Sequence, residues 1–333
     1  MIGVAIVGCG LIGQKRAATL SGARLVACAD LDVARAEGLA RTVTGAVAAD
    51  NWRAAIDRTD VDIIVVSTTN DGLAEIACAA VEAGKHVMVE KPAARTVAEI
   101  DSLMDAARRS RRHVRVGFNH RYHPALLKAR KHADAGALGE LMFVRGRYGH
   151  GGRIGYDKEW RADPERSGGG ELIDQGVHLI DLARWFLGDF AVVDGFAHTY
   201  FWQMPVDDNA FMLLRTARDQ AAFLHVSCTE WKNLFSMEIY GKNAKLHVEG
   251  LGGSYGVERL TFYKMLPEMG PPETTVWEYP RGDESWALEF AEFLEDVRLQ
   301  RPPSAGVADA RAALSVVEEV YRQSGYSPWT ARV

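Results

Sequence analysis

Residues 2–13 read IGVAIVGCGLIG, in which a short apolar run passes directly into a glycine-rich turn. The run at 2–7 predicts a buried strand, and the residues after Gly10 predict a helix. Strand, turn and helix around G-x-G-x-x-G form the context in which this motif binds a dinucleotide. Gly8 permits the turn, Gly10 lets the backbone approach a pyrophosphate, and Gly13 lets the helix pack closely on the strand.

The start of this helix supplies the remaining contacts to the phosphates. Backbone N–H groups in the first turn of a helix have no partner within the helix and point toward bound anions. We therefore expect the first helical residues, Leu11 and Ile12, to belong to the cofactor site together with the three glycines.

A carboxylate follows the second apolar run, residues 24–29. Asp30 lies 20 residues after Gly10, where an acidic side chain binds the ribose hydroxyls of the adenosine. A carboxylate repels a 2′-phosphate, so Asp30 predicts NAD rather than NADP, although Arg35 nearby opposes that preference. The alternative is that Asp30 only caps the next helix.

Polar residues also follow two further apolar runs, 62–66 and 86–89. Ligands bind at the carboxyl ends of the strands in open α/β sheets. We therefore expect cofactor contacts from Ser67, Thr68 and Asn70, and a functional cation in Lys91. Helix capping by Asn70 or Asp71 is the alternative for the first group, and a solvated strand end is the alternative for the lysine.

The first third of the chain alternates between strand and helix patterns, which predicts a doubly wound parallel sheet, the α/β Rossmann arrangement. The expected strands are 2–7, 24–29, 62–67, 86–90 and 113–118. The expected helices are 11–21, 33–43, 73–83 and 97–109.

The rhythm changes near residue 120. Helices are expected at 124–133, 171–187, 286–299 and 307–324. Strands are expected at 141–148, 192–202, 210–215, 221–228, 236–240, 245–248, 258–263 and 275–279. The sequence therefore predicts a Rossmann domain over 1–120 and an α+β domain over 121–333 with a large, mainly antiparallel open sheet.

Two titratable residues share one face of the apolar helix at 171–187. Asp174 and His178 are four positions apart, and their neighbours are apolar. Such a pair suits proton transfer, with His178 taking a hydroxyl proton and Asp174 orienting it or contacting the substrate. A purely structural hydrogen bond within the helix is the alternative. The presence of Lys91 favours catalysis, because a cation beside a reacting oxygen stabilises its developing charge.

Composition excludes several classes of protein. The 333 residues are 47% apolar and 25% charged, with a formal net charge of −5, which is ordinary globular composition without an excess of basic residues for nucleic acid. No apolar run is long enough to span a membrane, and four scattered cysteines indicate reduced thiols and a cytoplasmic protein. His120 and His123 lack a third ligand nearby, so no metal site is expected.

Several longer motifs are similar to those of a known protein family, and the resemblance covers essentially the whole chain. The chain resembles the glucose–fructose oxidoreductase, inositol dehydrogenase and MocA (Gfo/Idh/MocA) family. Its motifs are GCGLIG at 8–13, VEKP at 89–92, GFNHRYHP at 117–124, EWR at 159–161 and GGGELIDQGVHLIDLARWFLG at 168–188. The family implies a Rossmann domain, a second domain with an open sheet, and NAD(P)-dependent oxidation or reduction of a sugar or cyclitol hydroxyl.

The resemblance also implies roles for individual residues. The family's catalytic lysine, aspartate and histidine fall on Lys91, Asp174 and His178. Its Trp-Arg pair near the nicotinamide falls on Trp160 and Arg161, and the acid beside its lysine falls on Glu90. We further expect substrate contacts from Asn119, Arg153 and Tyr156, in addition to Lys91, Asp174 and His178.

Charge is unevenly distributed along the chain. Residues 108–166 contain 15 Lys and Arg but only 6 Asp and Glu. Such a basic segment beside the expected active-site loop favours an anionic substrate, with a nucleotide sugar as the leading candidate and Arg153 or Arg161 as its contact. The alternative is a solvated helix surface.

The sequence therefore predicts an NAD-dependent dehydrogenase acting on a secondary alcohol of a sugar, a cyclitol or a sugar derivative. One alternative is a glycosidase that uses transient oxidation by bound NAD, and another is a non-catalytic NAD sensor. We expect a homo-oligomer, either a dimer or a tetramer, because the apolar face of the second sheet would otherwise meet water. The face is expected to carry some of the residues Tyr200, Trp202, Phe223 and Tyr240.

Overall fold

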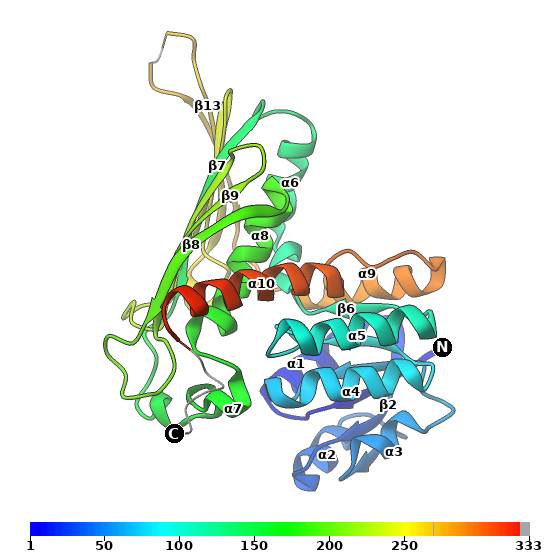
Figure 1. The fold of residues 1–333 in the computed structure, drawn as a ribbon. Coiled ribbons are helices and arrows are strands. Elements are labelled where there is room, and N and C mark those ends of the chain that lie inside the picture. Colours follow the sequence, from blue (N-terminus) through cyan, green and yellow to red (C-terminus); the bar gives the residue numbers. More distant parts are fainter. Residues whose placement is uncertain (269, 327–333) are drawn as a thin grey trace. The chain divides into compact units, whose positions relative to one another are not determined.

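The computed structural model describes residues 1–268 and 270–326, which form two compact units (Figure 1). Unit 1 contains Met1–Phe118, Arg166–Gly168 and Trp286–Leu314. Unit 2 contains Asn119–Glu165, Gly169–Ser285 and the described residues from Ser315 onward. The chain therefore returns to unit 1 twice, whereas the sequence-based division placed everything after residue 120 in the second domain.

Unit 1 is built on a six-stranded parallel sheet in the order β3-β2-β1-β4-β5-β6, which confirms the predicted Rossmann class. Its strands are β1 (Ile2–Val7), β2 (Ala23–Ala29), β3 (Val47–Ala49), β4 (Ile63–Val66), β5 (His86–Val89) and β6 (Val114–Val116). Its helices include α1 (Leu11–Ala18), α2 (Val33–Ala40), α3 (Trp52–Ile56), α4 (Asn70–Glu82) and α5 (Val97–Ser110). Helices α4 and α5 lie side by side (Figure 1).

Helix α9 (Ser285–Leu299) explains why a late segment belongs to unit 1. Phe290, Phe293 and Leu294 are buried in the same apolar cluster as Val4 and Ile6 of β1. Burying a large side chain contributes roughly 1.5–3 kcal/mol. Helix α9 therefore completes the core of unit 1.

Unit 2 contains an eight-stranded sheet in the order β14-β13-β12-β11-β7-β10-β9-β8. Only the β7–β10 pair is parallel among these described strands, so the sheet is mainly antiparallel as predicted. The strands are β7 (Leu141–Gly149), β8 (Phe190–His198), β9 (Asn209–Thr216), β10 (Ala221–Ser227), β11 (Leu234–Gly241), β12 (Ala244–Glu249), β13 (Glu258–Lys264) and β14 (Glu273–Tyr279).

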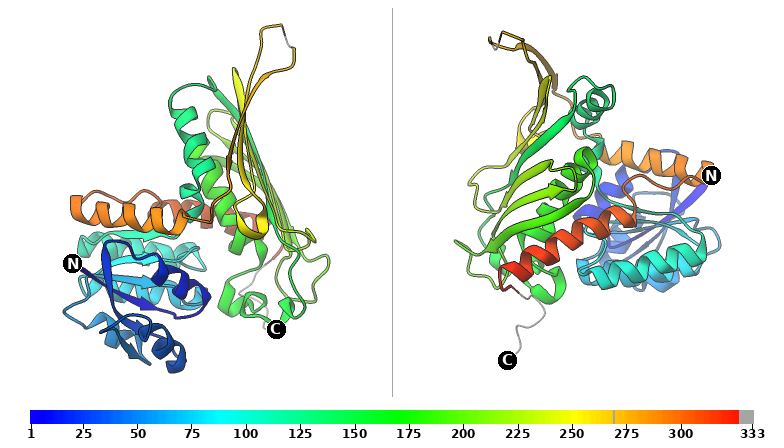
Figure 2. Two further views of the ribbon diagram at one scale, coloured as in Figure 1. Left: turned by 180° about the vertical axis from the view of Figure 1, so that it is seen from behind. Right: turned by 45° about the horizontal axis from the view of Figure 1, so that its top comes forward.

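Two helices, α6 (Pro124–Asp134) and α8 (Val177–Leu187), pack on this sheet (Figure 2). Helices α7 (Pro164–Ser167) and α10 (Val307–Gln323) contain residues of both units. None of the helices in the described part of the chain is both long and apolar enough to cross a membrane.

A π-helical turn, Leu172–Gly176, precedes α8. The sequence predicts one regular helix over 171–187, whereas the structure has a π-turn followed by α8. The turn contains Asp174, whereas His178 lies in the first turn of α8. Single π-turns are rare and frequently lie at functional sites.

A buried ion cluster connects three segments of unit 1. The guanidinium of Arg16 in α1 lies 2.5 Å from a carboxylate oxygen of Glu90 and 2.6 Å from one of Glu289 in α9. All three side chains are buried, and the Trp286 ring lies 4.3 Å from the Arg16 guanidinium carbon. Burial raises the pKa of Glu289. The cluster therefore fixes helix α1, the end of β5 and helix α9 to one another.

Replacing Arg16 by Met tests how much this cluster contributes to the stability of the fold. We expect a loss of about 3–5 kcal/mol in the free energy of unfolding, because two buried carboxylates lose their cation. Urea unfolding of Arg16→Met measures the loss. The control is Arg41→Met. Arg41 lies 3.4 Å from Glu37 in an exposed ion pair, so this substitution should lower the free energy of unfolding by less than about 1 kcal/mol. Equal stabilities of the two variants would contradict a structural role for the cluster.

Candidate active site

The turn after β1 has the backbone geometry that the glycine motif predicts. Gly8 has a φ of +90°, which strongly favours glycine, and its N–H donates to the Ala29 carbonyl at 2.8 Å. A Cβ at Gly8 would lie 2.5 Å from the Ser67 carbonyl oxygen. A Cβ at Gly13 would lie 2.0 Å from the Gly8 carbonyl oxygen, so helix α1 approaches the turn too closely for any side chain.

Gly10 differs from the other two glycines. A Cβ at this position would meet no atom within 4 Å, so the protein itself does not require glycine there. Gly10 is the N-cap of α1, and Leu11 in the first turn is 71% exposed. Open space in front of the helix N-terminus is what a pyrophosphate needs. The residues of the turn therefore fit the phosphates of a dinucleotide.

Asp30 lies at the carboxyl end of β2, beside the glycine turn. Its carboxylate accepts hydrogen bonds from Cys9 N–H at 2.7 Å and from Asp32 N–H at 2.9 Å. The side chain that caps α2 belongs to Asp32, which accepts from Ala34 N–H, and not to Asp30. A carboxylate has about four acceptor positions, so Asp30 retains capacity for ribose hydroxyls. Its contact with the cofactor stays a prediction.

The polar residues after β4 have assignable contacts within unit 1. Ser67 Oγ donates to the Gly8 carbonyl at 2.8 Å and so braces the glycine turn. The Asn70 amide donates to the Ser167 carbonyl at 2.8 Å and ties the short segment 166–168 to α4. Thr68 Oγ donates to the neighbouring Thr69 carbonyl at 3.1 Å. The N-cap of α4 is Thr69, and no side chain caps it, so neither Asn70 nor Asp71 has the capping role that was the alternative.

Glu90 and Lys91 follow β5 at the same edge of the parallel sheet. The Glu90 carboxylate is buried and engaged by Arg16, so the structure gives it a place in the ion cluster. Lys91 is half-buried in unit 1. Asp174 and His178 belong to unit 2, so the three expected catalytic residues come from both units.

His178 lies in an aromatic cluster inside unit 2. It is 3% exposed, and its ring stacks on that of His120 with centroids 3.9 Å apart. Tyr148 on β7 packs against both rings, at 5.1 Å from His120 and 6.3 Å from His178. Asn119 Oδ1 lies 3.2 Å from His120 Nδ1, so this expected substrate contact lies beside the histidine pair.

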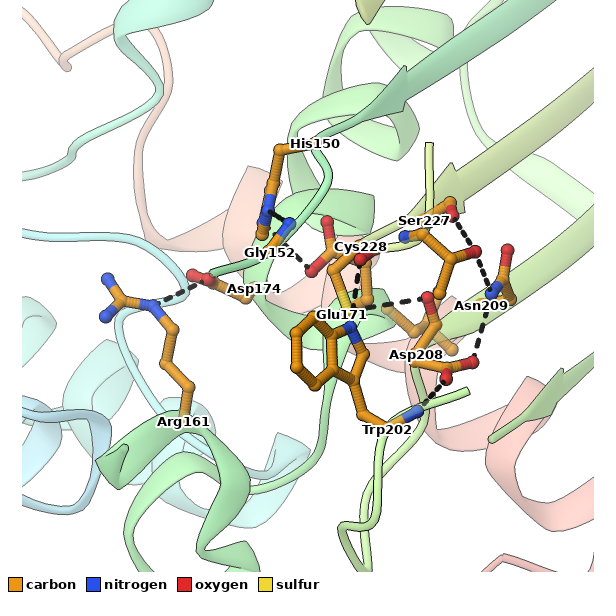
Figure 3. A network of polar contacts seen from close by, with 12 residues as sticks. His150, Gly152, Arg161, Glu171, Asp174, Trp202, Asp208, Asn209, Ser227 and Cys228 are labelled. Atoms are coloured by element: carbon orange, nitrogen blue, oxygen red, sulfur yellow. Dashed lines mark hydrogen bonds and ion pairs between the residues drawn. The ribbon is translucent and has the colours of Figure 1, made fainter. Parts of the chain in front are cut away.

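Asp174 forms an ion pair with Arg161 (Figure 3). Arg161 Nε donates to an Asp174 carboxylate oxygen at 2.9 Å, and its guanidinium lies 4.6 Å from the Trp160 ring centre. The negative charge of Asp174 is the main cause of the raised pKa of Arg161. Two predicted site regions, 159–161 and the segment at 174–178, are thus in contact.

His150 and Glu171, two titratable side chains near Asp174, were not predicted from the sequence. Glu171 is fully buried, and its carboxylate lies 3.6 Å from His150 Nε2 (Figure 3). Burial opposes protonation of His150, but Glu171 raises its pKa above the ordinary value. Burial and the charge of Glu171 also raise the pKa of Tyr156, whose ring lies 5.4 Å from His150. The Tyr156 hydroxyl is therefore a donor at neutral pH.

Trp202 packs beside these side chains. Its indole N–H donates to the Cys228 carbonyl at 3.0 Å (Figure 3), and its ring lies 5.6 Å from that of Tyr156. Contacts of this kind join loops far apart in sequence, so no local pattern signals them. The sequence could have pointed to His150 and Glu171 only through their position, because both are polar residues at the end of a strand or the start of an apolar helix.

The basic segment at 108–166 is extensively paired with carboxylates. Arg153 lies 2.7 Å from Glu159, and Arg161 is bound by Asp174, so both expected anion contacts already have acidic partners. The other arginines of the segment with ion pairs are Arg108, Arg109, Arg115, Arg121, Arg130 and Arg145. The two arginines expected to contact an anion are therefore both engaged in ion pairs within unit 2.

The described residues provide no ligand set for a metal ion. Within residues 1–268 and 270–326, no group of three or more His, Cys, Asp or Glu side chains could hold a metal ion. His120 and His123 instead contact other rings, and His123 Nδ1 also lies 3.0 Å from Glu258.

Comparisons with known proteins agree with this architecture. Residues 2–118 match the family model described as the Gfo/Idh/MocA oxidoreductase family with an NAD-binding Rossmann fold. Residues 126–247 match the model of the Gfo/Idh/MocA C-terminal domain. The predicted family, fold class and NAD-binding Rossmann domain are thereby confirmed.

Relatives add detail to these matches. A levoglucosan dehydrogenase of Pseudarthrobacter phenanthrenivorans is 35% identical over 50% of this chain and 44% of its own length. Inositol 2-dehydrogenase 2 of Saccharopolyspora erythraea is 34% identical over 59% of this chain and 56% of its own length. The chain therefore spans about half the length of these curated relatives.

A solved structure covers more of the chain. A levoglucosan dehydrogenase in complex with NADH and levoglucosan aligns with a TM-score of 0.85 over 97% of this chain and 98% of its own. The two sequences are 25% identical over this alignment.

The contrast between Gly10 and Gly13 gives a test of the cofactor site. Gly10→Ala should leave the melting temperature unchanged but weaken NADH binding at least about tenfold, since about 1.4 kcal/mol corresponds to that factor. Gly13→Ala should instead lower stability by about 1–3 kcal/mol through overpacking. Thermal unfolding and titration of NADH fluorescence measure both effects. Wild-type affinity in Gly10→Ala would show that the phosphates bind elsewhere.

Proposed function

Because the chain belongs to the Gfo/Idh/MocA family, we propose that it is an NAD-dependent dehydrogenase acting on a secondary alcohol of a sugar or cyclitol. The observation that carries the proposal is the glycine turn, whose Gly10 leaves open space at the N-terminus of α1. The buried His178 and the Asp174–Arg161 pair of unit 2 supply the acid–base groups. The names of the relatives support the class of substrate.

The residues of unit 1 hold the cofactor in this proposal. The N–H groups at the start of α1 bind the pyrophosphate, and Asp30 accepts hydrogen bonds from the adenosine ribose. When bound, NAD accepts the hydride that leaves the carbon of the alcohol. Asp30 disfavours a 2′-phosphate through charge repulsion, so NAD is preferred over NADP.

Three side chains act on the hydroxyl group in this proposal. His178 removes the hydroxyl proton, and stacking on His120 at 3.9 Å fixes the plane of its ring. Lys91 stabilises the negative charge that develops on the oxygen. Asp174 holds the substrate or orients His178, while Arg161 holds the Asp174 carboxylate in place at 2.9 Å.

The remaining predicted contacts define the substrate pocket. Tyr156 donates a hydrogen bond from a hydroxyl that stays protonated, and Asn119 lies beside His120. Trp160 and Arg161 face the nicotinamide end in this proposal. An anionic or nucleotide sugar would compete with Glu159 for Arg153, whose side chain is 69% exposed. The names of the relatives, a levoglucosan and an inositol dehydrogenase, support a neutral polyol instead.

A screen for NADH formation tests the proposal directly. Inositols, free sugars, anhydrosugars, sugar acids and nucleotide sugars are incubated with NAD or NADP, and the absorbance of the reduced cofactor is followed. We expect turnover of a neutral sugar or cyclitol with NAD and a KM that does not change with salt. Cleavage of a glycoside without net NADH would instead identify a glycosidase, and NAD binding without any turnover would identify a sensor.

Substitution of the acid–base residues then tests the mechanism. His178→Ala and Lys91→Ala should each lower kcat by at least about a hundredfold, which is the usual contribution of one such group. NADH affinity should change far less, because neither residue binds the phosphates. Arg41→Met, at the exposed C-cap of α2, serves as the control. A His178→Ala variant with near-normal kcat would remove this histidine from the mechanism.

We also propose that a second copy of this chain covers the outer face of the sheet in unit 2. Phe196, Leu213 and Phe223 on β8, β9 and β10 are 47%, 52% and 51% exposed, and Leu213 lies directly opposite Phe223. A contiguous apolar patch of this kind favours a dimer or tetramer. Tyr200 and Trp202 do not belong to this face, because β8 ends at His198 and both follow it in a loop.

Light scattering of Phe223→Glu tests this assembly. A buried charge at an interface costs several kcal/mol, so we expect the variant to dissociate at micromolar concentration while the wild type stays oligomeric. Leu299→Glu, at an exposed position of unit 1, should keep the wild-type mass. A wild type that is already monomeric would overturn the proposal.

A further inference from the structure

Asp207 lies in the interior of unit 2 and is fully buried. One carboxylate oxygen accepts hydrogen bonds from Gly170 N–H at 2.9 Å and from the Tyr321 hydroxyl at 2.7 Å. The other accepts from Leu172 N–H at 2.8 Å. Burial raises the pKa of Asp207 to about 6, which still leaves the carboxylate ionised at neutral pH.

The backbone of Asp207 takes part as well. Its carbonyl oxygen accepts from Glu171 N–H at 2.9 Å, so three consecutive N–H groups, 170–172, end on this one residue. The N–H groups at the start of a helix have no partner within the helix and otherwise bind water. These three begin the π-helical turn that carries Asp174 and leads into His178.

Steric fit restricts the same connection. A Cβ at Gly170 would lie 1.9 Å from the Asp207 carbonyl oxygen, and a Cβ at Gly169 would lie 2.2 Å from the Tyr321 hydroxyl. The Gly170 N–H also lies 3.1 Å from that hydroxyl. The glycines before the π-turn therefore allow Asp207 and Tyr321 to approach the backbone within hydrogen-bond distance.

We propose that Asp207 and Tyr321 are positioning residues for the reaction: they fix the start of the π-turn and thereby the placement of Asp174 and His178. The inference rests on the proposed dehydrogenase activity, because it assigns consequences for kcat. Neither residue needs to contact the substrate or the cofactor. Both act through the backbone of residues 170–172.

Ordinary helix capping does not account for these features. The cap of α2, Asp32, has a half-exposed side chain and accepts one N–H of its helix at 3.2 Å. Asp207 comes from a segment 37 residues away, is fully buried and engages two N–H groups and a hydroxyl with its carboxylate. Hydrogen bonds to an ionised acceptor are about twice as strong as neutral ones. Several strong hydrogen bonds from one buried carboxylate are expected where a rare backbone conformation must be held in one position.

The Asp207→Asn and Tyr321→Phe variants test the inference. In Asp207→Asn, one oxygen becomes an NH2 group that faces a backbone N–H, so the two donors repel each other. We expect kcat to fall about tenfold to a hundredfold, since small misplacements of reacting groups have effects of this size. KM and NADH affinity should change by less than about threefold. Tyr321→Phe removes one hydrogen bond and should lower kcat by a smaller factor.

Asp296→Asn is the control for a loss of stability alone. Asp296 is equally buried, but its carboxylate forms an ion pair with the buried Arg115 in unit 1, whereas residues 170–172 belong to unit 2. We expect a comparable loss of thermal stability in Asp296→Asn with kcat within about twofold of the wild type. A simple stability effect would instead lower kcat equally in both variants and would overturn the inference.

Hydrogen exchange gives a readout besides activity. In Asp207→Asn and Tyr321→Phe, amide exchange of the peptide spanning 168–180 should accelerate, while that of β9 and β10 stays at the wild-type rate. Unchanged exchange and unchanged kcat would refute the positioning role. An inactive wild type would instead refute the proposed dehydrogenase, whatever the exchange shows. Tyr321→Phe keeps the test decisive if Asp207→Asn fails to fold.

Discussion

The close approach of helix α1 to strand β1 determines much of unit 1. A Cβ at Gly13 would lie 2.0 Å from the Gly8 carbonyl oxygen, so the helix can lie there only without a side chain. Arg16 lies one turn further on the same side of α1 and is therefore directed into the interior. Its buried charge requires carboxylates, which Glu90 and Glu289 supply. The glycine turn, the end of β5 and helix α9 thus depend on one packing distance.

Unit 2 positions its proposed acid–base groups by a different means. The segment that carries Asp174 and His178 begins with three N–H groups bound by Asp207, continues as a π-turn and ends in an apolar helix on the sheet. Arg161 then holds the Asp174 carboxylate from outside the helix. In both units, a buried charge with several partners fixes a backbone segment, and that segment positions residues of the proposed site.

The sequence predicted those features that local patterns encode. Strand β1 and the glycine turn have the expected bounds, because apolar periodicity and backbone sterics act over few residues. Strand β3 and helix α3 were missed because three and five residues are too short for a period. The stacking of His120 on His178 and the burial of Glu171 depend on contacts between distant segments. The carboxylate partners of Arg153 and Arg161 likewise could not be read from the excess of basic residues.

The discontinuous composition of unit 1 has a consequence for synthesis of the chain. Phe290, Phe293 and Leu294 complete its apolar core, and Glu289 completes the partners of Arg16, yet all four residues lie in the last sixth of the sequence. The first 118 residues emerge from the ribosome with an uncovered apolar surface and a cation that has only one of its two carboxylates. At about 5–20 residues per second, the remaining chain takes on the order of 10 seconds or more to appear. The Rossmann unit is therefore encoded first but cannot complete its core until helix α9 has been made, and during that interval its apolar surface is exposed to aggregation.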